Sequence, residues 1–157
     1  MESYKLLLFL HILAVTVGLG VTFAFPFMQA IAERSGTTAT RIALTATRKI
    51  ENLIIIPGNV LLMVFGVGLI FDDGTGYKDD FPTWLMIAIP WYLAAFIAGI
   101  FIQRPLVTKA LATLQGRKDE RLPGAYLPLG KRMQMVGGIL GLSIVGVLFL
   151  MTWKPGG

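Results

Sequence analysis

The chain has 157 residues, of which 55% are hydrophobic and only 15% are charged, and its mean hydropathy is +0.70. A soluble domain of this size needs a larger polar surface, so the composition indicates a polytopic membrane protein without a separate soluble domain. The absence of cysteine and the single histidine exclude disulfides, thiolate metal sites and zinc sites built from several imidazoles.

The positive charge is unevenly distributed along the chain, which has a formal net charge of +5. Most Lys and Arg residues lie in two connections, residues 33–49 and 104–132, and cytoplasmic loops of membrane proteins retain such residues. We therefore expect both connections in the cytoplasm, both termini outside, and a bacterial inner (plasma) membrane as the location. We then expect the basic residues to contact the lipid bilayer, and we do not expect the protein to bind nucleic acid.

The first predicted span covers residues 4–32, and its uncharged part is long enough to cross ~30 Å of hydrocarbon. His11, the only histidine, lies within it. Helical spacing places four small or weakly polar residues on the face of His11, which we interpret as the side that faces the bundle. These residues are Ala14, Val15, Gly18 and Thr22.

The second predicted span covers residues 50–71 and has Pro57 in its middle, where proline bends a helix. The polar connection before it is compatible with a helix. Helical periodicity predicts a polar-to-small seam along one side of the span, facing the bundle, with Asn59 as an interhelical hydrogen-bond anchor. The seam contains Arg48, Asn52, Asn59, Met63 and Gly66.

Glu51 is the only acidic residue that we expect near a membrane segment. It begins the second span beside Arg48 and Lys49, and Arg104 ends the third span at the same membrane face. We interpret Glu51 as a member of an interfacial ion pair. A proton relay is the alternative, because ionisable groups within membrane segments are often functional.

The third predicted span covers residues 84–103 and follows a short acidic loop outside the membrane, residues 72–83. The spacing of the aspartates in this loop does not match a calcium loop. Trp91 and Tyr92 follow a proline inside the span, and we expect them to fill the kink, contact with a ligand being the alternative. A short amphipathic helix is predicted between this span and Gly116.

The fourth predicted span covers residues 132–153 and is rich in glycine. Gly137 and Gly141 form a small-xxx-small pattern that lets helices approach closely. We expect this pattern to serve packing within the chain, and a homo-oligomer or a larger membrane complex is the alternative. The short connections favour an all-α, up-down bundle of four antiparallel spans.

The residues leave few options for chemistry. A hydrolytic triad lacks a second base, and no Walker, Rossmann or zincin motif occurs. The sequence favours a protein without enzymatic activity but does not decide the point. A small accessory or structural membrane protein is the leading interpretation. A carrier of a small apolar or metal ligand is an alternative, with Met63 and Asn59 along its pathway.

Three short motifs carry a family resemblance. The motifs are Leu10-His11-Ile12 followed by glycines and Pro26, Pro57-Gly58-Asn59, and Trp84-Leu85. Over about residues 6–153 the chain resembles a bacterial four-helix integral membrane family of unassigned function. Its first helix is more distantly similar to the HemJ-type protoporphyrinogen oxidases and the copper-resistance D membrane proteins.

The more distant resemblance implies a haem b-binding oxidoreductase. In the HemJ-type enzymes, a first-helix histidine and a lysine after a Trp-Leu pair are associated with haem b and activity. His11 and Pro26 match the first helix in spacing. The chain departs from the pattern at Met86, where the lysine would stand, and at Ala32, where a further histidine would follow the proline.

His11 is therefore the residue with the sharpest hypothesis. At 1.5 Å per residue, His11 and Met63 lie at similar depths of ~10 and ~12 Å below the outer surface. His/Met ligation of a b-type haem is then a geometric option, with Gly18 and Gly66 leaving room for a flat ligand. The alternative is a hydrogen bond from His11 to a neighbouring helix, through Asn59 or a backbone carbonyl freed by Pro57.

Overall fold

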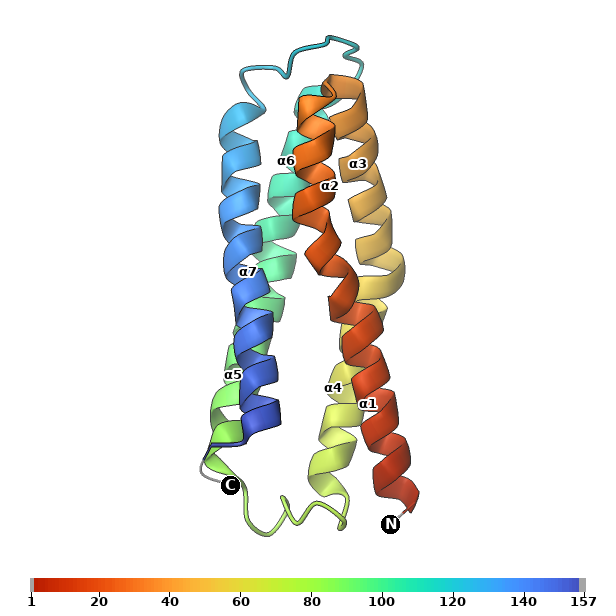
Figure 1. Cartoon of the computed structure of the whole chain (residues 1–157), viewed down its shortest axis with the longest axis vertical. Coiled ribbons are helices and arrows are strands. Elements are labelled where there is room, and N and C mark those ends of the chain that lie inside the picture. The colour runs from red at the N-terminus through yellow and green to blue at the C-terminus, as the bar shows by residue number, and fades with distance from the viewer. Residues whose placement is uncertain (1, 156–157) are drawn as a thin grey trace.

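The computed structural model describes residues 2–155, and these form four long helices in an up-down bundle (Figure 1). All four are long and apolar enough to cross a membrane, with 27 to 35 residues each. We call them spans 1 to 4. Their bounds are Glu2–Arg34, Thr37–Phe71, Thr83–Leu114 and Leu127–Trp153.

The first three spans are each interrupted by one irregular turn. Span 1 consists of α1 (Glu2–Gly20), the 3₁₀ turn η1 (Val21–Ala24) and α2 (Phe25–Arg34). Span 2 consists of α3 (Thr37–Ile50), the π turn η2 (Glu51–Ile55) and α4 (Ile56–Phe71). Span 3 consists of α5 (Thr83–Ala98), the π turn η3 (Gly99–Gln103) and α6 (Arg104–Leu114), and span 4 is the single helix α7 (Leu127–Trp153).

A proline accounts for the position of each irregular turn. Pro26, Pro57 and Pro105 stand at the second position of α2, α4 and α6, directly after η1, η2 and η3. Proline has no backbone N–H and its ring clashes with the carbonyl four residues earlier, so the preceding turn must open or tighten. The three irregular turns lie in the middle part of the bundle (Figure 1).

The helices are longer than the predicted spans of 4–32, 50–71, 84–103 and 132–153. The connection at 37–49 is helical and continuous with span 2, and the amphipathic segment after residue 103 continues span 3 instead of forming a separate helix. Hydropathy identifies only the part of each helix that lies in hydrocarbon. At 1.5 Å per residue, a helix of 33 residues extends for about 50 Å, well beyond a ~30 Å hydrocarbon core.

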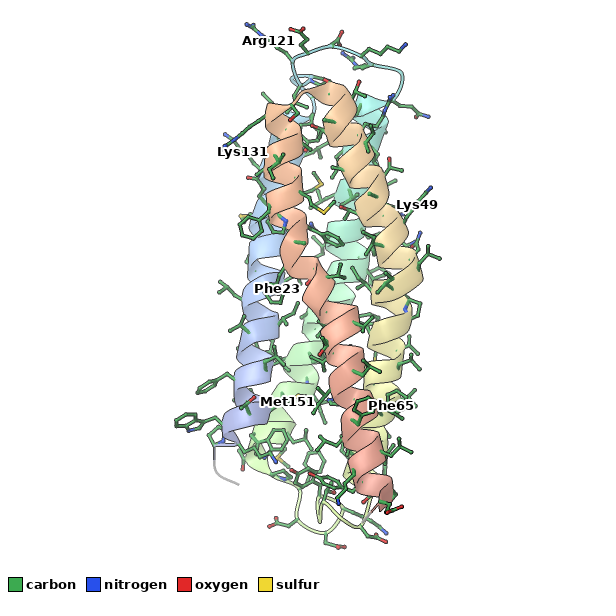
Figure 2. The ribbon with its side chains drawn as sticks, turned by 45° about the vertical axis from the view of Figure 1, so that its right-hand side comes forward. Phe23, Lys49, Phe65, Arg121, Lys131 and Met151 are labelled. Carbon is green, nitrogen blue, oxygen red and sulfur yellow. The ribbon has the colours of Figure 1, made fainter. Side chains whose placement is uncertain are left out.

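Most of the basic residues lie at one end of the bundle. Figure 2 shows Arg121, Lys131 and Lys49 toward the end opposite to that where span 1 begins and span 4 ends. At this end the turn after span 1 contains Gly36, whose φ of 101° favours glycine. The loop between spans 3 and 4 covers this turn, and the Thr37 hydroxyl donates a hydrogen bond to the Arg121 carbonyl at 2.9 Å.

Glycines allow the spans to pack in pairs. Spans 1 and 2 approach closely where Gly18 meets Gly58, because a Cβ atom at Gly58 would lie 2.7 Å from the Gly18 Cα atom. Spans 3 and 4 meet where Gly146 receives the Trp91 ring. Small residues at such crossings let the backbones come together, as is usual between membrane helices.

Two clusters of buried side chains lie at opposite ends of the bundle. The cluster at the basic end contains Leu44, Val107, Ala110, Leu114, Tyr126 and Met133. The cluster at the other end contains Trp84, Leu85, Ala88 and Val147. Large apolar side chains such as Phe9 and Leu142 are exposed on the outside, as expected for a lipid-facing surface. The space between the two clusters is where the bundle is hollow.

Candidate functional site: a cavity between the helix pairs

A cavity of about 210 Å³ lies inside the bundle and is lined by all four spans. It is far larger than the ~10–15 Å³ that one water molecule needs. Its walls are mainly apolar, because most of the large side chains that line it are aliphatic or aromatic. They include Val15, Leu19 and Phe25 from span 1, Leu44, Ile55 and Leu62 from span 2, Phe96 and Ile100 from span 3, and Leu140, Ile144, Leu148 and Met151 from span 4.

The cavity opens between spans 1 and 4. Three of its lining residues are exposed at the surface, namely Pro26 on α2 and Gln134 and Leu148 on α7. Figure 1 shows α1 and α7 diverging toward the end where span 1 begins. In a membrane this opening faces the lipid.

Polar side chains reach the cavity from each of the three irregular turns. Thr22 lies in η1, Glu51 begins η2, and Gln103 ends η3, and all three line the cavity. An irregular turn re-aims the side chains around it, and π turns occur frequently at functional sites. The prolines therefore determine both where the helices bend and where polar groups face the interior.

Asn59 and Tyr92 join the two helix pairs across the cavity. The Tyr92 hydroxyl donates a hydrogen bond to Asn59 Oδ1 at 2.7 Å, and Asn59 Nδ2 donates to the Ile55 carbonyl at 2.7 Å. Asn59 is 2% exposed, so both polar ends of its amide are paired in a buried position. The sequence predicted Asn59 as an interhelical anchor, and the structure places it in this role with Tyr92 as its partner.

The predicted polar seam of span 2 is wrong at Asn52. Asn52 is exposed and accepts a hydrogen bond from Arg104 Nη2 at 2.9 Å, away from the cavity. The π turn η2 inserts one extra residue between Asn52 and Asn59, which shifts the helical phase by ~100°. Regular helical periodicity predicts that Asn52, seven residues before Asn59, faces the bundle. With the extra residue of the π turn, Glu51, eight residues before Asn59, faces the cavity instead.

Arg104 and Arg48 lie next to these π turns, on the side toward the basic end of the bundle. Arg48 Nη1 donates to the Arg104 carbonyl at 3.0 Å and lies 4.0 Å from Glu51 Oε2. The expected ion pair of Glu51 is thus a loose contact with Arg48. Arg104 itself binds Asn52 and does not line the cavity.

His11 forms a hydrogen bond within the pair of spans 1 and 2. Its Nδ1 atom lies 3.1 Å from the Leu62 carbonyl, and because a carbonyl only accepts, Nδ1 is the protonated nitrogen. The predicted hydrogen bond to a neighbouring helix is present. Its partner is neither Asn59 nor the carbonyl freed by Pro57, which belongs to Leu53.

The space expected for a flat ligand beside Gly18 and Gly66 is filled. Gly18 packs against the Gly58 backbone, and a Cβ atom at Gly66 would lie 3.2 Å from His11 Cε1, so the imidazole itself occupies the space over Gly66. Neither His11 nor Met63 lines the cavity. The contacts of His11 therefore leave no slot for a haem at these two glycines, and ligation by His11 and Met63 stays a prediction without a matching pocket.

The expectation that Glu51 is the only acid near a membrane segment is also wrong. Glu33, near the end of α2, accepts hydrogen bonds from Tyr126 at 2.6 Å, Gln29 at 2.8 Å and Gln134 at 3.2 Å. Burial and the adjacent Glu33 raise the pKa of the Tyr126 hydroxyl, which keeps it protonated as a donor. This cluster closes spans 1 and 4 at the basic end.

Only a weak signal for the Glu33 cluster is present in the sequence. Gln29 and Glu33 are spaced for one helix face, but their partners Tyr126 and Gln134 follow a loop more than 90 residues later. No periodicity connects positions so far apart.

Gly137 and Gly141 do not form a helix crossing within the described chain. A Cβ atom at Gly141 would meet nothing within 4 Å, and one at Gly137 would meet only Gln103 Nε2, at 3.6 Å. Both glycines line the cavity. Their effect is to leave space inside the bundle, and close packing between spans 3 and 4 depends on Gly146 instead.

Among residues 2–155, no group of three or more His, Asp or Glu side chains is placed to hold a metal ion. Comparison with protein-family models identified a match over nearly the whole chain. The profile of a family described as "Predicted integral membrane protein (DUF2269)" matches residues 5–155. The search of curated proteins and the search of solved structures found no match.

Proposed function

The chain belongs to the DUF2269 family of predicted integral membrane proteins, and from the geometry of its cavity we propose that it is a membrane-embedded binding protein for an elongated, largely apolar molecule. The observation that carries this proposal is the cavity of about 210 Å³, which all four spans line and which opens between spans 1 and 4. A protein with a purely structural role gains nothing from such a space, because lost packing contacts destabilise a bundle.

The shape of the cavity favours a long ligand. Its lining extends along α7 from Met133 to Met151, which is about 27 Å at 1.5 Å per residue. This length is close to the thickness of the hydrocarbon core, so the occupant lies along the membrane normal. Concave, mostly apolar sites with a few convergent polar groups are typical of small-molecule binding.

The site supports holding a molecule better than transforming it. Glu51 is the only carboxylic acid among the residues that line the cavity, and His11 is not among them. We therefore assign the protein an accessory role in the bacterial inner membrane, where it retains its ligand or presents it to a larger membrane complex. The carrier hypothesis is kept in this form, but the pathway passes Asn59 without including Met63.

The proposal is tested by filling the cavity. Gly141→Leu adds a side chain inside it, and Gly138→Leu is the matched control, because Gly138 has equally open surroundings but does not line the cavity. We expect extraction and mass spectrometry of protein purified in mild detergent to find one enriched class of amphiphile in the wild type and in Gly138→Leu, but not in Gly141→Leu. Identical extracts from all three proteins would contradict the proposal.

A further inference from the structure

The polar groups of the cavity are unevenly distributed, and this distribution says which ligand fits. The lining near the outer end of α7, at Val147, Leu148 and Met151, is apolar. The irregular turns η2 and η3 supply Glu51 and Gln103 on the cytoplasmic side of Asn59. The cavity thus has an apolar part and a part with hydrogen-bonding groups.

Gln103 has one hydrogen-bond acceptor without a partner. Its Nε2 atom donates to the Met133 carbonyl at 3.3 Å, and since a carbonyl only accepts, this contact fixes the orientation of the amide. The opposite atom, Oε1, is buried and has no hydrogen-bond partner among residues 2–155. It is the single side-chain atom of this kind in the described chain. A buried acceptor of this kind is costly unless something donates to it.

Glu51 adds a second acceptor to the same part of the cavity. Its carboxylate lies at 4.0 Å from Arg48 Nη1, which is too far for a good hydrogen bond, and that guanidinium nitrogen donates to the Arg104 carbonyl at 3.0 Å. An ionised carboxylate only accepts hydrogen bonds. Both groups therefore call for a donor, and neither suits a ligand whose head group only accepts.

We infer that the ligand is an amphipathic molecule whose head group donates hydrogen bonds to Gln103 Oε1 and the Glu51 carboxylate, while its hydrocarbon tail lies along α7 toward Met151. A hydroxyl or a primary amine provides this chemistry. The inference rests on the proposed binding function and specifies the ligand class and its orientation. A lipid with this head enters through the opening between spans 1 and 4 with its head toward the cytoplasmic half.

The test uses three photoreactive probes with the same diazirine-bearing hexadecyl chain, namely the alcohol, the primary amine and the methyl ether of the alcohol. The ether keeps the chain and an acceptor oxygen but has no donor. We expect the alcohol or the amine to label cavity residues of the purified wild-type protein roughly tenfold more than the ether at equal concentration, as the loss of one hydrogen bond to a buried group predicts. The first two arms distinguish a hydroxyl from an amine head.

Variants connect this preference to the named atoms. Gln103→Met removes the unpartnered acceptor and is expected to reduce the preference for the alcohol over the ether, whereas the cavity-lining variant Ser143→Ala retains the full preference. If Gln103→Met does not fold, Glu51→Gln is the second variant, because it leaves the hydrogen bond from Gln103 Nε2 to the Met133 carbonyl intact. Glu51→Gln should lower labelling by the preferred probe.

Two outcomes separate the inference from the function on which it rests. Equal labelling of cavity residues by all three probes in the wild type overturns the assigned head group but leaves the binding function in place. A donor preference that is undiminished in both Gln103→Met and Glu51→Gln likewise overturns the inference. Failure of every probe to label the cavity overturns the proposed function itself.

Discussion

Gly58 shows how a single hydrogen atom in place of a side chain determines the packing of two spans. A methyl group at this position would lie 2.7 Å from the Gly18 Cα atom, which belongs to a backbone that cannot move alone. We expect Gly58→Ala to lower the free energy of unfolding by about 1–3 kcal/mol, because overpacking forces the helices apart. Titration of the detergent-solubilised protein with sodium dodecyl sulfate, followed by circular dichroism, measures this loss.

Gly20 provides the matched control for Gly58. A Cβ atom there meets nothing within 4 Å, and its backbone conformation is ordinary for a helix, with φ at −58°. Gly20→Ala should therefore leave stability unchanged or raise it by up to ~1 kcal/mol through helix propensity. Equal losses in the two variants would contradict the close approach of Gly58 and Gly18.

His11 and Gly66 form a second pair whose effects depend on each other. His11→Ala removes the hydrogen bond to the Leu62 carbonyl and leaves a gap over Gly66, so we expect a loss of ~1–2 kcal/mol. Gly66→Ala alone crowds the imidazole, since its Cβ atom would lie 3.2 Å from His11 Cε1. In the double variant the new methyl group fills the gap, so the two losses should not add.

Strict additivity in this cycle would show that His11 does not pack on Gly66. The absorption spectrum of the same preparations, purified from haem-sufficient cells and incubated with haemin, tests the alternative role of His11. With the imidazole engaged by Leu62 and covering Gly66, we expect no Soret band that depends on His11. A band present in the wild type and lost in His11→Ala would make His11 a haem ligand.

At the scale of helices, one side-chain hydrogen bond joins α4 and α5 across the cavity. Tyr92→Phe removes the donor and leaves Asn59 Oδ1 without it. We expect a loss of about 1 kcal/mol, in the range of interhelical hydrogen bonds in membranes. In a double-mutant cycle, Asn59→Leu should lower the free energy of unfolding less in the Tyr92→Phe background than in the wild type. The expected coupling energy is about 0.6–1 kcal/mol. A coupling energy of zero would contradict this contact.

The irregular turns also explain how much the sequence can predict. Hydropathy was sufficient for the four spans and their antiparallel order, because each apolar block is long and uninterrupted by charge. Thr22, Glu51 and Asn59 were singled out from the sequence, and all three line the cavity. The side of the helix on which Asn52 lies was not predictable, because regular helical periodicity does not include the extra residue of a π turn.

Other features depend on contacts between distant segments. The orphaned acceptor of Gln103 arises only because its Nε2 atom meets Met133 on another span. The closure of spans 1 and 4 by Glu33 likewise requires Tyr126 from beyond a loop. Pro26, Pro57 and Pro105 each follow an irregular turn, which is 3₁₀ in span 1 and π in spans 2 and 3, whereas Pro90 lies inside the regular helix α5. The presence of a proline therefore does not by itself predict an irregular turn or its type.

At the scale of the whole molecule, the bundle is firm at both ends and hollow between them. One cluster of buried side chains lies near each end of the bundle. The cavity lies at the level of the irregular turns and extends along α7 toward Met151. The Glu33 cluster joins spans 1 and 4 at the basic end, so under the proposed function a ligand would enter between the opposite halves of these spans. Access is therefore coupled to the membrane orientation of the bundle.

The orientation is the last prediction, and the cysteine-free chain makes it direct to test. Asp79 lies in the loop after span 2 and Lys118 in the loop after span 3, and both are exposed at opposite ends of the bundle. Because cytoplasmic loops retain Lys and Arg, the end with Lys118 should face the cytoplasm. In intact spheroplasts, a membrane-impermeant maleimide should label Asp79→Cys at once and Lys118→Cys only after permeabilisation. The reverse pattern would invert the bundle, and the acceptors of the cavity would then face the outer half of the membrane.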